Sequence, residues 1–180
     1  ENLKTIHKTK NSAFIKVYGR RRVGKTELIL NFLKGLPKGT YLYYYVDKTE
    51  DKVYYQTLSD AIERQIGDKI IISSWDDFFD YIAKKSQDRF VLVIDEAPRV
   101  MDTGSIFLTR LQHAWGTDPK LENSKIMAII VGSSIGMMDR MTDQHGPLYG
   151  RITHTIKLSP FRYVDFRQVF KDVSEQDIIQ

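Results

Sequence analysis

The sequence predicts an α/β protein, a three-layer α/β/α sandwich built around a five-stranded, mainly parallel sheet. Short apolar segments alternate with longer segments whose apolar residues recur at helical spacing, as in a parallel sheet with helical crossovers. Several of the short segments are apolar at nearly every position, which strands covered on both faces require. With 180 residues and 42% apolar residues, the chain is long enough for one domain with a full core.

The composition narrows the class of protein. Charged residues make up 28% of the chain, an ordinary share for a soluble globular protein. The chain has no cysteine, which excludes disulfides and thiolate metal sites, and we expect a reducing, cytoplasmic setting. No apolar run approaches the length that crosses a bilayer and no signal-peptide pattern opens the chain, so we expect no membrane association.

The two ends of the chain suggest a piece of a longer protein. The chain begins at Glu1 in place of a methionine, and its polar last segment, 171–180, resembles the start of a further element. We therefore expect residues 1–180 to form a single core domain excised from a longer chain.

Positive charge is concentrated near the beginning of the chain. The net charge is +4, yet residues 1–38 hold ten Lys or Arg and two acids, which makes this segment +8 and the remainder −4. A basic pole that binds phosphate explains this asymmetry, and a nucleic-acid surface is the alternative. The charge of a segment does not by itself distinguish the two.

A polar opening segment, 1–12, is expected to hold the end of a helix and a loop. The first strand follows over 13–18, and residues 19–26 fit the pattern G-x-x-x-x-G-K-S/T of a phosphate-binding loop. A helix is expected over 25–36, because apolar residues recur there at helical spacing until glycine and proline end it. The motif requires a strand, a loop and a helix in this order, and the sequence supplies them.

The residue types of the loop suit a nucleoside triphosphate. Glycines let main-chain N–H groups turn inward around phosphates, and the helix that follows points its positive end at them. Lys25 is expected to reach the β- and γ-phosphates, and the Thr26 hydroxyl to ligate Mg²⁺. A turn that merely joins strand to helix is the alternative. The residues expected to contact the nucleotide are Gly19, Arg22, Val23, Gly24, Lys25, Thr26 and Glu27.

A second strand and two helices are expected next. The strand, 40–46, is rich in tyrosine; aromatic residues favour strands, and stacking of these rings on a nucleobase is the alternative. Amphipathic helices are expected over 50–66 and 76–85, joined by a linker. Ser74 is expected to cap the second helix, with Asp77 three residues further on.

The third strand, 90–95, ends in two acids, which is the Walker B pattern. Five apolar residues precede Asp95, which is expected to hold Mg²⁺ through water at the carboxyl end of the strand. Glu96 is expected to polarise the attacking water. A core strand that reaches the surface at an acidic loop is the alternative, but the phosphate-binding loop upstream favours the functional interpretation.

A helix over 105–115 and a fourth strand over 126–132 follow. In P-loop enzymes of the additional-strand type, this strand lies between the Walker A and Walker B strands, and a polar residue at its end points at the γ-phosphate. Ser133 is the candidate for this sensing role, with Ser134 in reserve. Capping of a helix expected over 135–141 explains these serines equally well.

Arg151 precedes the fifth strand, which is expected over 153–158. It is a candidate for contact with phosphates, in this subunit or in a neighbour, as an arginine finger makes. A solvated surface arginine is the alternative. A final helix is expected over 163–170.

These motifs together resemble the archaeal-type ATPases, a branch of the signal-transducing (STAND) P-loop ATPases that is related to AAA+ and origin-recognition proteins. The resemblance covers the whole chain. A generic P-loop protein would match only the first two of the five motifs that carry it, which are residues 18–28, 94–98, 132–138, 147–151 and 158–161.

The resemblance implies a fold and a set of roles. By analogy with P-loop folds that have the additional strand, the spatial strand order is expected to be 5-1-4-3-2. Lys25 and Thr26 match the phosphate and Mg²⁺ contacts, Asp95 the metal-holding acid, and Glu96 the catalytic base. Ser133 matches the polar sensor, and Arg151 lies in the Gly-Arg motif of the family.

The chain also departs from the family pattern. Family members usually begin with a segment bearing an Arg-Glu motif that helps to hold adenine, of which only residues 1–3 could be a remnant. They usually continue into a helical lid and a winged-helix domain, and neither is expected within residues 1–180. The adenine-binding residues are therefore not assigned, and contact with C-terminal domains or self-association is expected.

The predicted function is Mg²⁺-dependent binding and hydrolysis of ATP to ADP and phosphate, used as a conformational switch or motor in a larger protein. GTP is disfavoured because no Asn-Lys-x-Asp motif is present. One alternative is an ATP-dependent nucleic-acid-binding module that hydrolyses little, motivated by the basic opening segment. A small-molecule kinase is another, and the acidic pair disfavours it, because a kinase activates a substrate hydroxyl in place of water.

Overall fold

A computed structural model describes residues 3–47, 51–101 and 105–160. Five strands form one sheet in the order β2-β3-β4-β1-β5, with every pair of neighbours parallel. Read from the other edge, this is the predicted order 5-1-4-3-2, which is therefore confirmed. The strands are β1 (Ala13–Tyr18), β2 (Tyr41–Tyr45), β3 (Phe90–Asp95), β4 (Ile126–Gly132) and β5 (His154–Lys157).

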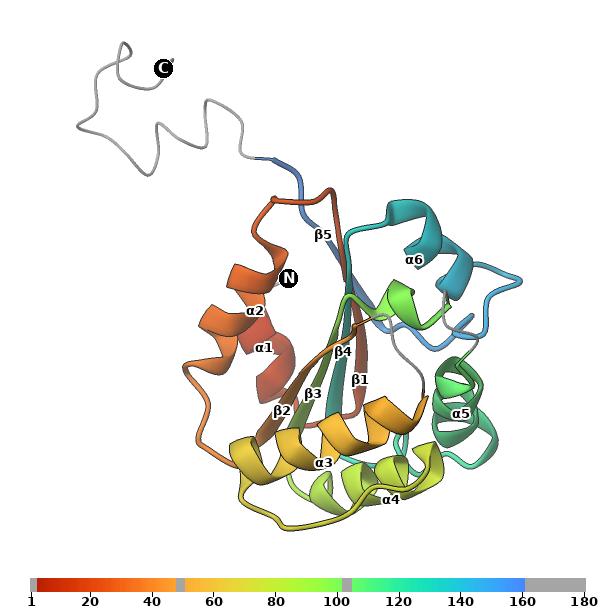
Figure 1. Ribbon diagram of the computed structural model, residues 1–180. Helices are drawn as coiled ribbons and strands as arrows, with labels where there is room; N and C mark the ends of the chain where they lie inside the picture. The colour runs from red at the N-terminus through yellow and green to blue at the C-terminus, as the bar shows by residue number, and fades with distance from the viewer. Residues whose placement is uncertain (1–2, 48–50, 102–104, 161–180) are drawn as a thin grey trace, which may run out of the picture.

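Helices cover both faces of the sheet, as Figure 1 shows. They are α1 (Leu3–Lys8), α2 (Lys25–Leu33), α3 (Asp51–Ile66), α4 (Trp75–Lys85), α5 (Phe107–Gln112) and α6 (Ile135–Thr142). A 3₁₀ turn (Ala97–Met101) follows β3, and a π-helical turn (His113–Thr117) follows α5. Within the described ranges, no helix is both long and apolar enough to cross a membrane.

Two apolar clusters form the core, one on each face of the sheet. Strand side chains alternate between the faces, so Ile15 and Val17 of β1 pack with α1 and α2, while Phe14 packs with α3 to α6. The central strands β3 and β4 are buried at every position, which explains their uniformly apolar sequences. The three-layer prediction is confirmed by this arrangement.

The register brings the ends of the central strands to one edge of the sheet. Tyr18 of β1 pairs with Gly132 of β4, and Ile94 of β3 pairs with Ile130 of β4. All strands point the same way, so the loops that follow β1, β3 and β4 emerge side by side at the carboxyl edge. The phosphate-binding loop, the acidic pair and the serines thus start from adjacent points.

The element bounds differ from the predicted ones in a few places. The helix α2 ends at Leu33, because Gly35 and Leu36 close tight turns onto Phe32 and Leu33. The helix expected over 105–115 is shorter and continues as the π-helical turn, which places Trp115 against Phe14 with ring centroids 4.6 Å apart. The expected final helix, 163–170, lies outside the described residues.

The predicted cap of α4 is confirmed. Ser74 precedes the helix in an extended conformation, and its side chain accepts a hydrogen bond from the main-chain N–H of Asp77 over 3.0 Å. The carboxylate of Asp77 in turn accepts from Ser73, so the first turn of α4 is tied to the linker before it.

Candidate nucleotide-binding site

The loop between β1 and α2 depends on its glycines for two different reasons. Gly24 occupies the left-handed region at φ 86°, as the residue before α2, where a side chain is disfavoured. Gly19 lies so close to β5 that an added Cβ would collide with the main-chain oxygen of Leu158. Arg22 also adopts a positive φ of 66°, so the loop curls tightly and turns towards the start of α2.

Lys25 lies inside this loop. It is the first residue of α2, and only 6% of it is exposed. Its ammonium group donates to the main-chain oxygens of Gly19 over 3.1 Å and Arg20 over 2.8 Å. A cation is thereby held inside the loop at the positive end of α2, which is a suitable place for a phosphate.

Most of the predicted loop residues share one cavity of about 370 Å³ with Glu96 and Ser133, while Asp95 lies buried beside Thr26 and does not line it. Residues of three separate chain segments face the cavity, so the structure brings most of the sequence-predicted site residues together. Its lining is Arg21, Arg22, Gly24, Lys25, Thr26, Glu27, Glu96 and Ser133. Of the other predicted residues, Gly19 is buried beneath the loop and Val23 is half-buried within it.

Asp95 is the best-connected side chain near the cavity. It is 1% exposed, and its Oδ2 accepts hydrogen bonds from the hydroxyls of Thr26 (2.9 Å) and Tyr43 (2.7 Å). Its Oδ1 accepts from the main-chain N–H of Glu96 over 2.8 Å. Burial, and then the hydrogen bond to this carboxylate, raise the pKa of Tyr43 well above its usual range, so Tyr43 stays a donor.

Glu96 is held in an uncommon conformation next to Ser133. Its φ is 53°, in the left-handed region that a non-glycine residue adopts only at a cost of about 1–3 kcal/mol. Ser133 Oγ donates to Glu96 Oε2 over 2.9 Å. Ser134 precedes α6 without a side-chain capping bond, so of the two serines it is Ser133 that contacts the acidic pair, and its role as a γ-phosphate sensor stays a prediction.

Lys16 ties β1 to the helix that follows these serines. It is only 7% exposed although it is charged, and its ammonium group donates to Asp139 over 2.8 Å and to Thr142 over 2.9 Å. Both partners belong to α6. The middle and the end of α6 are therefore anchored to β1.

Arg151 is not brought to the phosphate-binding loop. It lies at the amino edge of the sheet, two residues before Thr153, whose N–H bonds the carbonyl of Phe14 at the start of β1. Its guanidinium donates to the carbonyl of Tyr149 over 2.9 Å and packs against Gly116. The position of Arg151 could have been predicted from the sequence, because a residue just before a parallel strand lies at the edge opposite the carboxyl ends. Contact with the nucleotide of a neighbouring subunit stays a prediction.

The donor set around Asp95 suits a magnesium ion carried by a nucleotide. Among the residues that the structure describes, no three His, Cys, Asp or Glu side chains come together as a metal cage. Mg²⁺ binds through one or two protein oxygens and takes its other ligands from phosphates and water. The Thr26 hydroxyl and the buried Asp95 carboxylate, 2.9 Å apart, provide such a pair.

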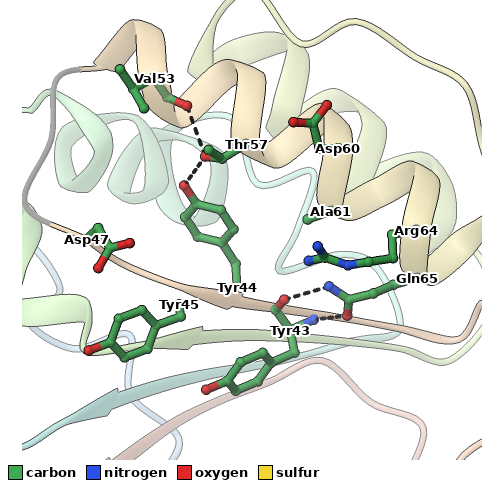
Figure 2. A pocket seen from close by; sticks show the side chains of 10 residues that line it. All are labelled: Tyr43, Tyr44, Tyr45, Asp47, Val53, Thr57, Asp60, Ala61, Arg64 and Gln65. Atoms are coloured by element: carbon green, nitrogen blue, oxygen red, sulfur yellow. Dashed lines mark hydrogen bonds between the residues drawn. The ribbon is translucent and has the colours of Figure 1, made fainter.

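A larger cavity of about 490 Å³ lies elsewhere, between β2 and α3. Figure 2 shows its lining, in which Tyr44 points towards Thr57 of α3 while the Tyr43 ring points away from that helix. Tyr44 is bonded to Thr57 over 2.6 Å and is buried. Tyr44 is thus explained by packing and by its hydrogen bond to α3, whereas Tyr45 is exposed beside the cavity and its stacking on a nucleobase stays an untested alternative.

The fold is that of the P-loop NTPases, with a phosphate-binding loop after the first strand and an acidic pair after the third. The chain belongs to the family described as an ATPase domain predominantly from Archaea, whose model matches residues 1–180.

Individual relatives are distant. The uncharacterized protein MJECL04 of Methanocaldococcus jannaschii is 28% identical over 184 residues, covering 100% of this chain and 39% of that protein. The Walker-type ATPase PABY2304 of Pyrococcus abyssi has a similar structure, with a TM-score of 0.69, 21% identity, and coverage of 97% of this chain and 59% of that one.

Two further solved structures share the fold. The ORC2 protein of Aeropyrum pernix, solved in ADPNP-ADP complexes, has a TM-score of 0.66 at 16% identity and covers 94% of this chain and 48% of that one. Cdc6p of Pyrobaculum aerophilum has a TM-score of 0.63 at 16% identity, with 95% and 46% covered. The chain therefore spans 39–59% of the length of these relatives.

Proposed function

We propose that this domain binds ATP with Mg²⁺ and hydrolyses it to ADP and phosphate, and that the cycle switches the conformation of a larger protein. The observation that carries the proposal is the shared cavity in which Lys25, Thr26 and Glu96 converge from two motifs far apart in sequence. Membership of an ATPase family and the ADPNP-ADP complexes of the ORC2 protein support it.

Each residue has a role in this proposal. Lys25 and the loop N–H groups bind the β- and γ-phosphates and offset the charge that develops on them. Glu96 accepts a hydrogen bond from the attacking water and aligns it with the γ-phosphorus. Ser133, which donates to Glu96, keeps that carboxylate oriented. Thr26 and Asp95 would hold the Mg²⁺ that accompanies the nucleotide, and the ion would supply positive charge that offsets the charge of the phosphates.

Calorimetric titration with ADP and ATP, with and without Mg²⁺, tests the binding step. The wild type is expected to bind, and Lys25→Ala to weaken binding on the order of 100-fold, since a charge-assisted contact to phosphate is lost. Lys34→Ala is the matched control, because Lys34 is an exposed lysine directly after the same helix and is expected to bind as the wild type does. Equal affinity in the wild type and Lys25→Ala would reject the site.

Phosphate release tests the chemical step separately. Glu96→Gln keeps the shape of the side chain but removes the charge that aligns water. It is expected to leave nucleotide affinity unchanged and to slow hydrolysis on the order of 100-fold. Turnover equal to that of the wild type would remove Glu96 from the catalytic role.

A second function, nucleic-acid binding, has its own supporting observation. Residues 1–38 carry a charge of +8, and Arg20, Arg21 and Arg22 are exposed together on the phosphate-binding loop. Fluorescence anisotropy with a labelled duplex, over a range of salt concentrations, tests this function. Binding that weakens steeply with salt supports it, because phosphate contacts release counterions. Lack of binding at low salt rejects it.

A further inference from the structure

Tyr43 extends the hydrogen-bond network of Asp95 beyond the two sequence motifs. It lies in the middle of β2 and pairs with Val93 of β3. Its hydroxyl donates to Asp95 Oδ2 over 2.7 Å, and the same oxygen accepts from Thr26 over 2.9 Å. Donors from two different elements, β2 and α2, thus meet at one carboxylate oxygen.

The main chain of Tyr43 is fixed independently by Gln65 of α3. The N–H of Tyr43 donates to Gln65 Oε1 over 2.9 Å, and Gln65 Nε2 donates to the carbonyl of Tyr43 over 2.8 Å (Figure 2). Because β2 is an edge strand, this N–H and this carbonyl face away from β3. The side-chain amide of Gln65 therefore takes the place of a sixth strand at this residue and holds Tyr43 still.

We propose that Tyr43 is a positioning residue for the metal-holding carboxylate, and that Gln65 positions Tyr43. The proposal rests on the proposed function, because it concerns a Mg²⁺–nucleotide complex bound at the phosphate-binding loop. It adds to that function a residue outside both motifs and a strand, β2, that contributes no residue to the sequence-predicted site.

The orientation of Asp95 depends on donors from three segments. Oδ1 is held by the N–H of Glu96, and Oδ2 by Thr26 and by Tyr43. Thr26 has a second task at a metal site, since its oxygen is the expected Mg²⁺ ligand. Tyr43 is then the donor that keeps Oδ2 in place whatever Thr26 binds. Removing a residue that hydrogen-bonds a metal ligand, without touching the metal itself, typically lowers metal affinity about 10–100-fold.

A purely structural role makes a different prediction. The Tyr43 ring packs with the apolar cluster between the sheet and α2, and phenylalanine would preserve that packing. If only packing matters, Tyr43→Phe changes nothing that involves the metal. If the substitution only destabilises the fold, nucleotide affinity falls equally with and without Mg²⁺.

The test is titration of ADP into the wild type and Tyr43→Phe, once with Mg²⁺ and once with EDTA. The measured quantity is the ratio of the two dissociation constants for each protein, which is independent of the folded fraction. The matched control is Tyr41→Phe, since Tyr41 packs on the same cluster but pairs with Val91, four residues before Asp95. The thermal midpoint of each variant is measured alongside.

In Tyr43→Phe, the gain in affinity from Mg²⁺ is expected to fall about tenfold, while affinity in EDTA stays within about twofold of the wild type. Tyr41→Phe is expected to keep the wild-type ratio. An unchanged ratio in Tyr43→Phe overturns the proposal and leaves the proposed function standing. Failure of the wild type to bind ADP under both conditions overturns both.

Discussion

The two edges of the sheet use buried and half-buried polar side chains in different ways. At the amino edge, the guanidinium of Arg89 donates to the carbonyls of Ile6 (3.0 Å), Asn11 (2.6 Å) and Lys125 (3.2 Å). It joins α1, the loop before β1 and the start of β4. At the carboxyl edge, Lys25 and Glu96 instead face a cavity that a ligand can enter.

Charged side chains stabilise the fold at the amino edge and face a ligand cavity at the carboxyl edge. The terminal guanidinium nitrogens of Arg89 donate to main-chain carbonyls of three segments, which stabilises the fold. The carboxyl edge gathers loops that follow parallel strands, where main-chain groups and side chains converge on a ligand. Substitutions at the amino edge should therefore lower stability, and those at the carboxyl edge should lower activity.

The largest effect is expected from Arg89→Leu. The substitution leaves three carbonyls without their charged donor, so the free energy of unfolding should fall by about 3 kcal/mol. Nucleotide affinity of the folded protein should not change. Urea denaturation measures the first quantity and titration the second. Arg110→Ala removes only an exposed ion pair with Asp76 and should cost less than about 1 kcal/mol; similar losses in both variants would contradict the distinction.

An effect on activity alone is expected from Ser133→Ala. Loss of the hydroxyl frees the Glu96 carboxylate, and hydrolysis should slow about tenfold, equivalent to about 1.4 kcal/mol in the barrier. Thermal midpoint and ADP affinity should stay close to the wild-type values. Ser134→Ala is the matched control, because Ser134 makes no capping bond. Equal slowing in both variants would mean that Ser133 acts through the local backbone.

A smaller effect on stability is expected from Gly116→Ala at the amino edge. The new Cβ would come within 2.7 Å of the Arg151 guanidinium, so that side chain must shift at a cost of about 1 kcal/mol. Thermal denaturation measures the loss. Gly136→Ala in α6 meets no atom within 4 Å and should be neutral or slightly stabilising, because alanine favours helix. Full tolerance of Gly116→Ala would show that Arg151 is not held in place there.

The smallest effect concerns pH. Burial, and then the charge of Arg89, lower the pKa of His7 below its ordinary value of 6.5. The unfolded chain therefore binds this proton at a higher pH than the folded one, so the stability linked to His7 is complete above that value and declines as the pH falls below it. His7→Gln should flatten the dependence of unfolding free energy on pH in acid. Substitution of the exposed His145 by Gln should leave that dependence as in the wild type.

Much of the carboxyl edge could be predicted from sequence, because its motifs are contiguous. Residues 19–26 specify a loop by local conformation, and the acidic pair follows an all-apolar strand. Parallel strands then bring both to one edge without further information. The position of Tyr43 was visible only as a tyrosine in a strand, since its contact with Asp95 depends on the pairing of β2 with β3.

Other contacts were also beyond local patterns. The sequence shows Lys16 only as a charged residue within a strand, and it gives no sign of the ion pair with Asp139, which is 123 residues away. The π-helical turn that brings Trp115 onto Phe14 leaves no signal in helical spacing.

The sequence by itself determined the three-layer fold, the strand bounds within a residue or two, and the identity of the loop and acidic residues. These follow from short-range propensity, apolar periodicity and motif spacing. The tertiary structure decided which side chains meet: Tyr43 and Thr26 at Asp95, and Ser133 at Glu96. The physical reason is that such meetings depend on the register between strands and the reach of each side chain, which segments distant in sequence set jointly.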